Sequence, residues 1–175
     1  MSGGDTQLRW ALTIVDALVD GGVARFVVSP GSRSTPLVLA LLARSLPVDV
    51  VIDERAAAFF ALGMARRSGT PVALVCTSGS AGAHYLPAII EAYEAGGVLV
   101  AVTADRPPEA QRTGASQTTT QTSLFGAHVV GTEDLGPPDG TVTSLRGVSG
   151  RVCRAVALAR RANAPVHINV PLRKP

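Results

Sequence analysis

The stretch Pro71-Val-Ala-Leu-Val-Cys-Thr-Ser-Gly-Ser80 decides the fold class, because it joins a continuously apolar run to a polar loop that contains glycine. A second stretch, Val98-Leu-Val-Ala-Val-Thr103, is apolar throughout in the same way. A strand with one solvated face alternates apolar and polar residues, whereas a continuously apolar strand is buried on both faces. The two stretches therefore predict inner strands of a parallel sheet that helices cover on both sides.

On either side of these strands, short apolar runs alternate with longer amphipathic segments. This rhythm is typical of an α/β fold with a doubly wound, mainly parallel sheet. The predicted helices span residues 6–20, 35–43, 55–67, 83–94 and 145–162, and the predicted strands span 25–28, 48–52, 72–76, 98–102 and 166–170. Residues 131–143 are interpreted as a surface connection, and residues 105–125 are expected to form a long mobile loop.

Size and composition predict one domain over residues 1–175. The chain has 175 residues, of which 46% are hydrophobic and 17% charged, with a mean hydropathy of +0.28. Such a chain buries a sufficient core without a disulfide or a structural metal. Cys76 and Cys153 lack the spacing of a zinc or disulfide motif and are interpreted as buried free thiols. The low content of charge indicates that a partner covers part of the surface.

Charge and targeting features exclude several functional classes. The net charge is +3, but the basic residues concentrate between Arg151 and Pro175, where no acidic residue occurs. Basic and aromatic residues are not interleaved, which argues against a nucleic-acid-binding module. The first residues do not form a signal peptide, and no apolar run approaches the roughly 18 to 20 residues of a membrane span. We therefore expect a cytoplasmic protein without membrane insertion.

Polar residues follow four of the predicted strands directly. They form the segments Ser29-Pro-Gly-Ser-Arg-Ser-Thr-Pro36, Asp53-Glu-Arg55, Thr77-Ser-Gly-Ser80 and Thr103-Ala-Asp-Arg-Pro-Pro-Glu109. The carboxyl ends of parallel strands meet at one edge of a sheet, and α/β proteins bind their ligands at that edge. The sequence therefore predicts a ligand site there.

Each of these segments also has a purely structural interpretation. The guanidinium of Arg33 suits a carboxylate or phosphate, but a solvated arginine in a capped turn fits the sequence equally well. The loop over residues 77–80 can present backbone N–H groups to an anion, yet it lacks the Walker lysine and the GxGxxG spacing, and serine capping of a helix explains it too. Glu54 opens a helix after an apolar run, so its carboxylate is expected to be partly desolvated, and the helix dipole, an ion pair or a ligand can stabilise it.

Other catalytic and metal-binding patterns do not occur in the sequence. His84, His128 and His167 do not have the spacing of metal ligands and are interpreted as packing residues, so no metal site is predicted. The GxSxG turn of a serine hydrolase is missing as well.

Six motifs, read in order, resemble the N-terminal pyrimidine-binding domain of one family of thiamine-diphosphate enzymes. The family is that of the 2-succinyl-5-enolpyruvyl-6-hydroxy-3-cyclohexene-1-carboxylate (SEPHCHC) synthases of menaquinone biosynthesis. The motifs are Ser29-Pro-Gly-Ser-Arg-Ser-Thr-Pro36, Asp53-Glu-Arg55, Thr77-Ser-Gly79, Thr103-Ala-Asp-Arg-Pro-Pro108, Gly114-Ala-Ser-Gln117 and Val166-His-Ile-Asn-Val-Pro171. The resemblance spans nearly the whole chain and implies the α/β fold of that domain.

The resemblance implies a transferase that uses thiamine diphosphate to decarboxylate 2-oxoglutarate and to add the succinyl unit to isochorismate. Glu54 matches the catalytic glutamate that hydrogen-bonds N1′ of the cofactor's aminopyrimidine. The other positions that match cofactor contacts are Thr77, Ser78 and Gly79, and those that match substrate contacts are Ser32, Arg33, Arg106 and Gln117.

The sequence departs from the family pattern at Ser80, Ser116 and His84, where threonine, asparagine and asparagine are usual. The family also needs a central domain and a C-terminal domain that holds Mg²⁺ and the diphosphate. Neither occurs in residues 1–175, so the chain alone is expected to be inactive and the full enzyme to be a homo-oligomer, either a dimer or a tetramer.

Two alternatives remain open at this point. The first is a free-standing, non-catalytic homologue that acts as an oligomerisation or ligand-binding module. The second is an unrelated flavodoxin-like phosphate binder, which rests only on residues 29–34 and 77–80.

Overall fold

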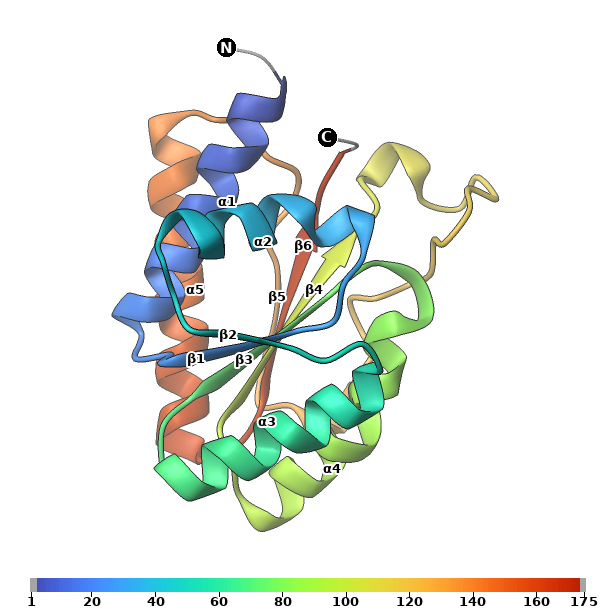
Figure 1. Ribbon diagram of the computed structural model, residues 1–175. Helices are drawn as coiled ribbons and strands as arrows, with labels where there is room; N and C mark the ends of the chain where they lie inside the picture. The colour runs from blue at the N-terminus through green and yellow to red at the C-terminus, as the bar shows by residue number, and fades with distance from the viewer. Residues whose placement is uncertain (1–2, 174–175) are drawn as a thin grey trace.

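The computed structural model describes residues 3–173, which form one parallel sheet with helices on both faces (Figure 1). The strands are β1 (Arg25–Val28), β2 (Val48–Val50), β3 (Val72–Cys76), β4 (Leu99–Asp105), β5 (Thr132–Asp134) and β6 (Val166–Pro171). The α-helices are α1 (Gly3–Asp20), α2 (Thr35–Ala43), α3 (Glu54–Ser68), α4 (Leu86–Ala95) and α5 (Val142–Ala162). The predicted doubly wound α/β fold is confirmed. Over this part of the chain, every helix is too short or too polar to cross a bilayer.

The sheet has the strand order β2-β1-β3-β4-β6-β5, with every neighbouring pair parallel. After β1 the chain moves outward to β2 and then returns to the other side of β1 as β3. The direction of winding therefore reverses between β1 and β3, and such a reversal leaves a crevice at the carboxyl ends of the two strands. The loops over residues 29–36 and 77–80 flank this crevice.

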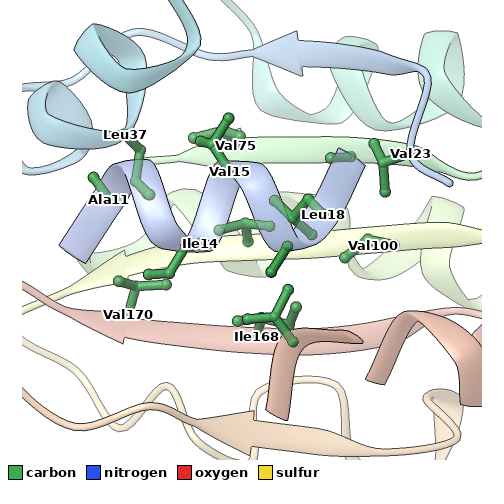
Figure 2. Packing of buried hydrophobic residues seen from close by; sticks show 14 of the residues in the cluster. Ala11, Ile14, Val15, Leu18, Val23, Leu37, Val75, Val100, Ile168 and Val170 are labelled. Carbon is green, nitrogen blue, oxygen red and sulfur yellow. The ribbon is translucent and has the colours of Figure 1, made fainter. Parts of the chain in front are cut away.

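Helices α1, α2 and α5 cover one face of the sheet with large aliphatic side chains. Figure 2 shows Ile14 and Leu18 of α1 directed at the sheet, near Val100 of β4 and Ile168 of β6. All four side chains are at most 1% exposed. Burial of one such side chain contributes roughly 1.5 to 3 kcal/mol, so this cluster is a main source of the free energy of folding.

Helices α3 and α4 cover the opposite face with small side chains. The inward positions are mainly alanines: Ala57, Ala58, Ala61, Ala65, Ala88 and Ala92. The outward side of α3 instead carries Phe59 and Phe60, which are 43% and 46% exposed. Val50 and Ile52, at the edge strand β2 and the turn that follows it, are also exposed, and we call these four residues the apolar edge.

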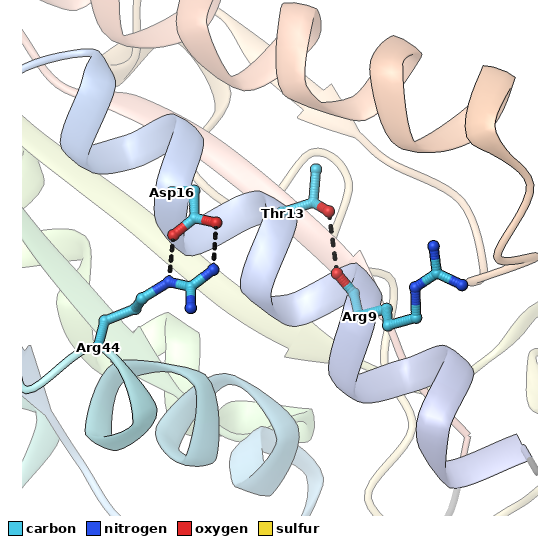
Figure 3. Close-up of polar contacts among 4 residues, drawn as sticks. All are labelled: Arg9, Thr13, Asp16 and Arg44. Carbon is cyan, nitrogen blue, oxygen red and sulfur yellow. Dashed lines mark hydrogen bonds and ion pairs between the residues drawn. The ribbon is translucent and has the colours of Figure 1, made fainter.

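An ion pair joins α1 to the end of α2. Arg44 donates from Nε to Oδ1 of Asp16 at 2.6 Å and from Nη2 to Oδ2 at 2.7 Å (Figure 3). In the same view, the Thr13 hydroxyl donates to the backbone carbonyl of Arg9 at 2.9 Å. The side chains of Arg44 and Asp16 are 45% and 44% exposed, so water screens their charges and the apolar contacts dominate the packing of α1 on α2.

Several features differ from the predictions. Strand β5 lies inside residues 131–143, which were interpreted as a surface connection. It is short, polar and at the sheet edge, so it lacks an apolar pattern.

The helix predicted over residues 83–94 begins as a 3₁₀ turn over Gly79–Tyr85 and is α-helical only from Leu86, because Pro87 has no N–H for an earlier α-helical bond. Cys76 is buried, but Cys153 is only partly buried; both thiols are free.

The segment that follows β4, predicted as a mobile loop over residues 105–125, is largely exposed over residues 112–120 but packs against the sheet at its end. Its regular structure is limited to 3₁₀ turns over Pro108–Ala110 and Gly126–His128. Nevertheless, Gln121 and Phe125 are each 1% exposed. The Phe125 ring meets the buried imidazole of His167 edge-on, with 4.8 Å between the ring centroids. These contacts hold the end of the segment, at Gln121 and Phe125, against β4 and β6.

Candidate functional site

The loops after β1 and β3 cross in direct contact at the crevice. The backbone N–H of Arg33 donates to the side-chain hydroxyl of Thr77 at 3.3 Å. A Cβ added at Gly31 would lie 2.3 Å from Cβ of Thr77, so a side chain at this position is sterically excluded. The two sequence motifs therefore form one structural unit.

The loop after β3 is held in a conformation that suits glycine. Gly79 has a φ of +85°, and a Cβ there would also lie 2.7 Å from Cγ of Gln117. The amide of Gln117 donates from Nε2 to the carbonyl of Ser78 at 3.1 Å. The predicted cofactor loop and the predicted substrate residue Gln117 therefore touch.

Two arginines converge on the same edge of the sheet. Arg33 is 7% exposed, and its Nη1 donates to the carbonyl of Leu172 at 3.0 Å. Burial, and then the positive charge of Arg106, lower the pKa of Arg33. The Nε of Arg106 is buried without a hydrogen-bond partner, and neither guanidinium forms an ion pair within residues 3–173. Like charges that have lost water are unfavourable unless an anion joins them, so this pair is suited to a carboxylate ligand.

Glu54 is the first residue of α3. Asp53 caps this helix by accepting the backbone N–H of Ala56 at 2.8 Å, which leaves the Glu54 side chain out of the capping interaction. Its carboxylate is partly buried and makes no hydrogen bond to any residue that the structure describes. Burial, and to a lesser extent the charge of Glu54, raise the pKa of Cys76 to about 12, and both also act to raise the pKa of Tyr85. The acid is therefore electrostatically coupled to buried groups at the end of β3.

Three buried hydroxyl groups in this region form no hydrogen bond of normal geometry within residues 3–173, although those of Ser29 and Tyr85 lie close enough to influence each other. They belong to Ser29 after β1, Ser78 after β3 and Tyr85 in the following 3₁₀ turn. A buried polar group without a hydrogen bond costs about 1 to 3 kcal/mol, and water or a ligand normally satisfies it. The crevice therefore offers unused hydrogen-bonding capacity beside an unpaired carboxylate.

A buried polar chain runs from the loop after β3 across the sheet. Gln121 accepts the backbone N–H of Gly79 on Oε1 at 2.8 Å and donates from Nε2 to Oδ1 of Asn169 at 3.1 Å. The hydroxyl of Thr103 donates to the same Oδ1 at 2.9 Å and lies 2.8 Å from Nε2 of His167. Burial lowers the pKa of His167 to about 4, so this imidazole is neutral at neutral pH.

The polar chain ends at Asp105, the last residue of β4. Its carboxylate accepts hydrogen bonds from Asn169 at 2.9 Å, from the backbone of Arg106 at 2.7 Å and from Gln111 at 3.3 Å. Burial raises the pKa of Asp105, although these hydrogen bonds act in the opposite direction. Asp105, Arg106 and Gln121 line a cleft of about 450 Å³ at this edge of the sheet.

The structure brings most of the predicted site residues together. Six of them are linked to another member by a hydrogen bond, a close approach or charge repulsion: Arg33, Thr77, Ser78, Gly79, Arg106 and Gln117. Ser32 lies beside them on an exposed part of the loop and lines a groove with Gly31. Glu54 approaches from α3 and forms no hydrogen bond with the others.

The sequence predicts no role for Gln121 or Asn169, although both take part in the buried polar chain. Asn169 lies within the motif Val166–Pro171. Gln121 follows Gln117 by four residues in a polar stretch before the apolar pair Leu124-Phe125, and nothing in this local sequence distinguishes it from other polar loop residues. Within residues 3–173, His, Cys, Asp and Glu side chains do not gather in a group of three or more that could hold a metal ion.

Comparison with known proteins agrees with this arrangement. Residues 9–124 match the family described as thiamine pyrophosphate enzyme, N-terminal TPP binding domain, where TPP is thiamine diphosphate under its other name. The chain is also similar to 2-succinyl-5-enolpyruvyl-6-hydroxy-3-cyclohexene-1-carboxylate synthases. It is 49% identical to that of Sorangium cellulosum over 100% of this chain, 51% identical to that of Geobacillus thermodenitrificans over 96%, and 48% identical to that of Halorubrum lacusprofundi over 100%.

In each of these comparisons the chain spans 29% of the relative's length. The match to the family model covers the crevice, both crossing loops, Glu54 and the polar segment up to Leu124. The chain therefore belongs to the thiamine pyrophosphate enzyme family and represents its N-terminal TPP binding domain.

Proposed function

We propose that this chain supplies the pyrimidine-binding half of the thiamine diphosphate site in a SEPHCHC synthase, which decarboxylates 2-oxoglutarate and adds the succinyl unit to isochorismate. The observation that carries the proposal is a pair of arginines beside the loop after β3: Arg33 is buried, Arg106 is partly buried, and neither forms an ion pair within residues 3–173. Both proposed substrates bear carboxylates, which a guanidinium binds with paired, charge-assisted hydrogen bonds. The relatives with the name of this enzyme support the choice of substrates.

The crevice residues fit an aminopyrimidine ring. Such a ring needs hydrogen-bond partners at its nitrogen atoms, and within residues 3–173 the Glu54 carboxylate and the buried Ser78 hydroxyl form no hydrogen bond. When bound, thiamine diphosphate supplies an acidic carbon that adds to 2-oxo acids and stabilises the negative charge left by decarboxylation.

Glu54 holds a proton against N1′ of the aminopyrimidine in this proposal. A partly buried carboxylate without an internal partner is free to form this hydrogen bond, and the low local polarity makes the bond stronger than it would be in water. Thr77, Ser78 and Gly79 contact the cofactor from the opposite loop, where the left-handed backbone of Gly79 determines which way the peptide groups point.

Arg33 and Arg106 bind the carboxylates of the substrates, with Ser32 and Gln117 as further polar contacts. Because Arg33 is anchored to the Leu172 carbonyl and Gln117 to the Ser78 carbonyl, both side chains are held before a substrate arrives. A prepositioned site loses less entropy on binding, so more of the binding energy goes into orienting the reacting atoms.

The proposal assigns Mg²⁺ and the diphosphate to a part of the enzyme outside this chain, so the 175-residue chain alone is inactive. It also assigns a cytoplasmic homo-oligomer, either a dimer or a tetramer. The apolar edge of Val50, Ile52, Phe59 and Phe60 supports this assignment, since exposed apolar groups of this kind mark protein contacts.

Replacement Glu54→Gln in the enzyme that carries this domain tests the catalytic assignment. The amide keeps the size of the side chain but cannot take part in proton transfer, so turnover is expected to fall by about 100-fold or more. Steady-state formation of product measures the effect. Glu94→Gln, which changes an exposed acid of α4, is the matched control. Near wild-type turnover of the Glu54 variant would remove this residue from the mechanism.

Replacement Arg106→Ala tests the substrate assignment separately. Loss of one charge-assisted contact is expected to raise the KM of a carboxylate substrate by about tenfold or more, whereas the Kd of thiamine diphosphate stays close to that of the wild type. The control is Arg67→Ala, an exposed arginine in the last turn of α3. Unchanged substrate kinetics would contradict the assignment.

A further inference from the structure

We propose that Gln121 is a positioning residue that fixes the loop after β3 against the carboxyl end of β4, and thereby sets the spacing between the cofactor contacts and Arg106. We call the hydrogen bonds of Gln121 to Gly79 and Ala104 the clamp. The clamp itself is independent of the proposed function, whereas its effect on the binding of cofactor and substrate rests on that function. Gln121 itself need not touch either ligand.

Gln121 uses both ends of its amide to join the loop after β3 to the carboxyl end of strand β4. Oε1 accepts the backbone N–H of Gly79 at 2.8 Å, and Nε2 donates to the backbone carbonyl of Ala104 at 3.1 Å. The side chain is 1% exposed, so water does not compete for these bonds. The residue after Ala104 is Asp105, and Arg106 follows directly, so one buried amide connects the loop that carries the proposed cofactor contacts to the strand end next to Arg106.

The orientation of this amide is determined by its neighbours. Nε2 of Gln121 also donates to Oδ1 of Asn169 at 3.1 Å. That oxygen accepts the Thr103 hydroxyl as well, while the Asn169 nitrogen donates to Asp105 at 2.9 Å. Asn169 therefore presents its oxygen to Gln121, which turns the Gln121 nitrogen towards Asn169 and its oxygen towards Gly79. Every polar atom of the Gln121 amide has a partner, as a rigid connection requires.

The loop that Gln121 holds is also one that depends on support. Gly79 is in the left-handed region, with a φ of +85°, and the Ser78 hydroxyl is buried without a partner. Two other side chains of the segment between β4 and β5 reinforce the same turn. Gln117 donates to the Ser78 carbonyl, and Thr119 donates to the Gly79 carbonyl at 3.3 Å. Of these three, only Gln121 is fully buried, so its removal leaves the Gly79 N–H unpaired in a dry environment.

Amide hydrogen exchange in this 175-residue chain tests the clamp without any ligand. Gln121→Met keeps the shape of the side chain and removes both hydrogen bonds, so exchange of the Gly79 amide is expected to accelerate by about tenfold or more. Exchange of the Leu74 amide in β3 reports on the whole fold and should not change. Gln121→Glu keeps an oxygen that accepts the Gly79 N–H, so its Gly79 amide is expected to exchange more slowly than that of the Met variant. Gln111→Met, a change on the same segment away from Gly79, is the control.

Two results overturn the clamp. One is wild-type exchange at Gly79 in Gln121→Met. The other is an equal acceleration at Gly79 and Leu74 in both Gln121 variants, because this would mean that Gln121 supports the whole domain and not the loop.

The full enzyme then tests the effect on function. Gln121→Met is expected to raise both the Kd of thiamine diphosphate and the KM of a carboxylate substrate, with Gln121→Glu closer to the wild type in cofactor binding. If exchange at Gly79 accelerates but Kd and KM stay unchanged, the positioning role is overturned while the clamp stands. If the wild-type enzyme does not bind thiamine diphosphate, the proposed function has failed and the exchange result is unaffected.

Discussion

The two faces of the sheet are closed in different ways. On the face of α1, α2 and α5, helices cover the strands from end to end with aliphatic side chains. On the other face, α3 and α4 cover the strands with alanines, and the segment after β4 closes the carboxyl half over a buried polar chain that includes Thr103, His167 and Asn169. The first face contains the larger apolar cluster, while the second positions polar groups that end at the candidate site. The first face therefore supplies most of the large apolar side chains of the core, and the second face holds the polar groups that lead to the candidate site.

The largest effect is expected from a cavity on the first face. Ile14→Ala removes a side chain that is 0% exposed and is expected to lower the free energy of unfolding by about 2 to 5 kcal/mol, measured by urea denaturation of this chain. The matched change Phe59→Ala, on the outward side of α3, removes a larger side chain that is 43% exposed and is expected to cost much less. Equal losses would show that burial of Ile14 against the sheet does not determine its contribution to stability.

A pH-dependent effect of intermediate size is expected from the polar chain of the second face. The folded state lowers the pKa of His167 from 6.5 to about 4 through burial. Between these values the unfolded chain binds more protons than the folded one, so the stabilisation is complete above about pH 6.5 and is lost as the pH falls towards 4. The loss reaches up to about 3 kcal/mol at the acidic end of this window.

The variant His167→Gln isolates this contribution from the titration of the carboxylates. Its amide can still donate to Thr103, but it does not titrate. The free energy of unfolding of the variant should therefore fall less steeply between pH 6.5 and 4 than that of the wild type. If the free energies of unfolding of the two proteins fall in parallel with pH, His167 binds its proton equally well in the folded and in the unfolded chain.

The smallest effect is expected on the outside of the first face. Asp16→Asn breaks the exposed ion pair with Arg44, and the melting temperature is expected to fall slightly at low ionic strength. The difference from the wild type should vanish in high salt, because salt screens exposed charges. A large loss that persists in high salt would show that the ion pair, and not the apolar contacts, holds α1 to α2.

The first face could be predicted from the sequence more completely than the second. Continuous apolar runs and helix periodicity indicated the strands β1 and β3 and the helix α2 with the bounds that the structure has. The loops of Arg33 and of Thr77 could be assigned to one edge of the sheet because parallel strands all end there. Their direct crossing at Gly31 could not, since it depends on the three-dimensional approach of two segments far apart in the sequence.

The second face contains what the sequence patterns did not reveal. Strand β5 has three polar or acidic residues at a sheet edge, so it has neither an apolar run nor a buried alternation. Gln121 looks like any polar loop residue, because a hydrogen bond to the backbone of Gly79, 42 positions away, leaves no local pattern. The same holds for Arg33 and the carbonyl of Leu172, which are 139 positions apart.

The crossing of the two loops limits how this edge of the sheet can change. The backbone at Gly31 runs so near to Thr77 that even one methyl group would collide with it, although its extended φ of −176° suits any residue. Ser32, one position later, points to solvent and meets no such obstacle. Variants meant to change the surface of this edge should therefore replace Ser32 and keep the preceding glycine, since a side chain at Gly31 would push the two loops apart.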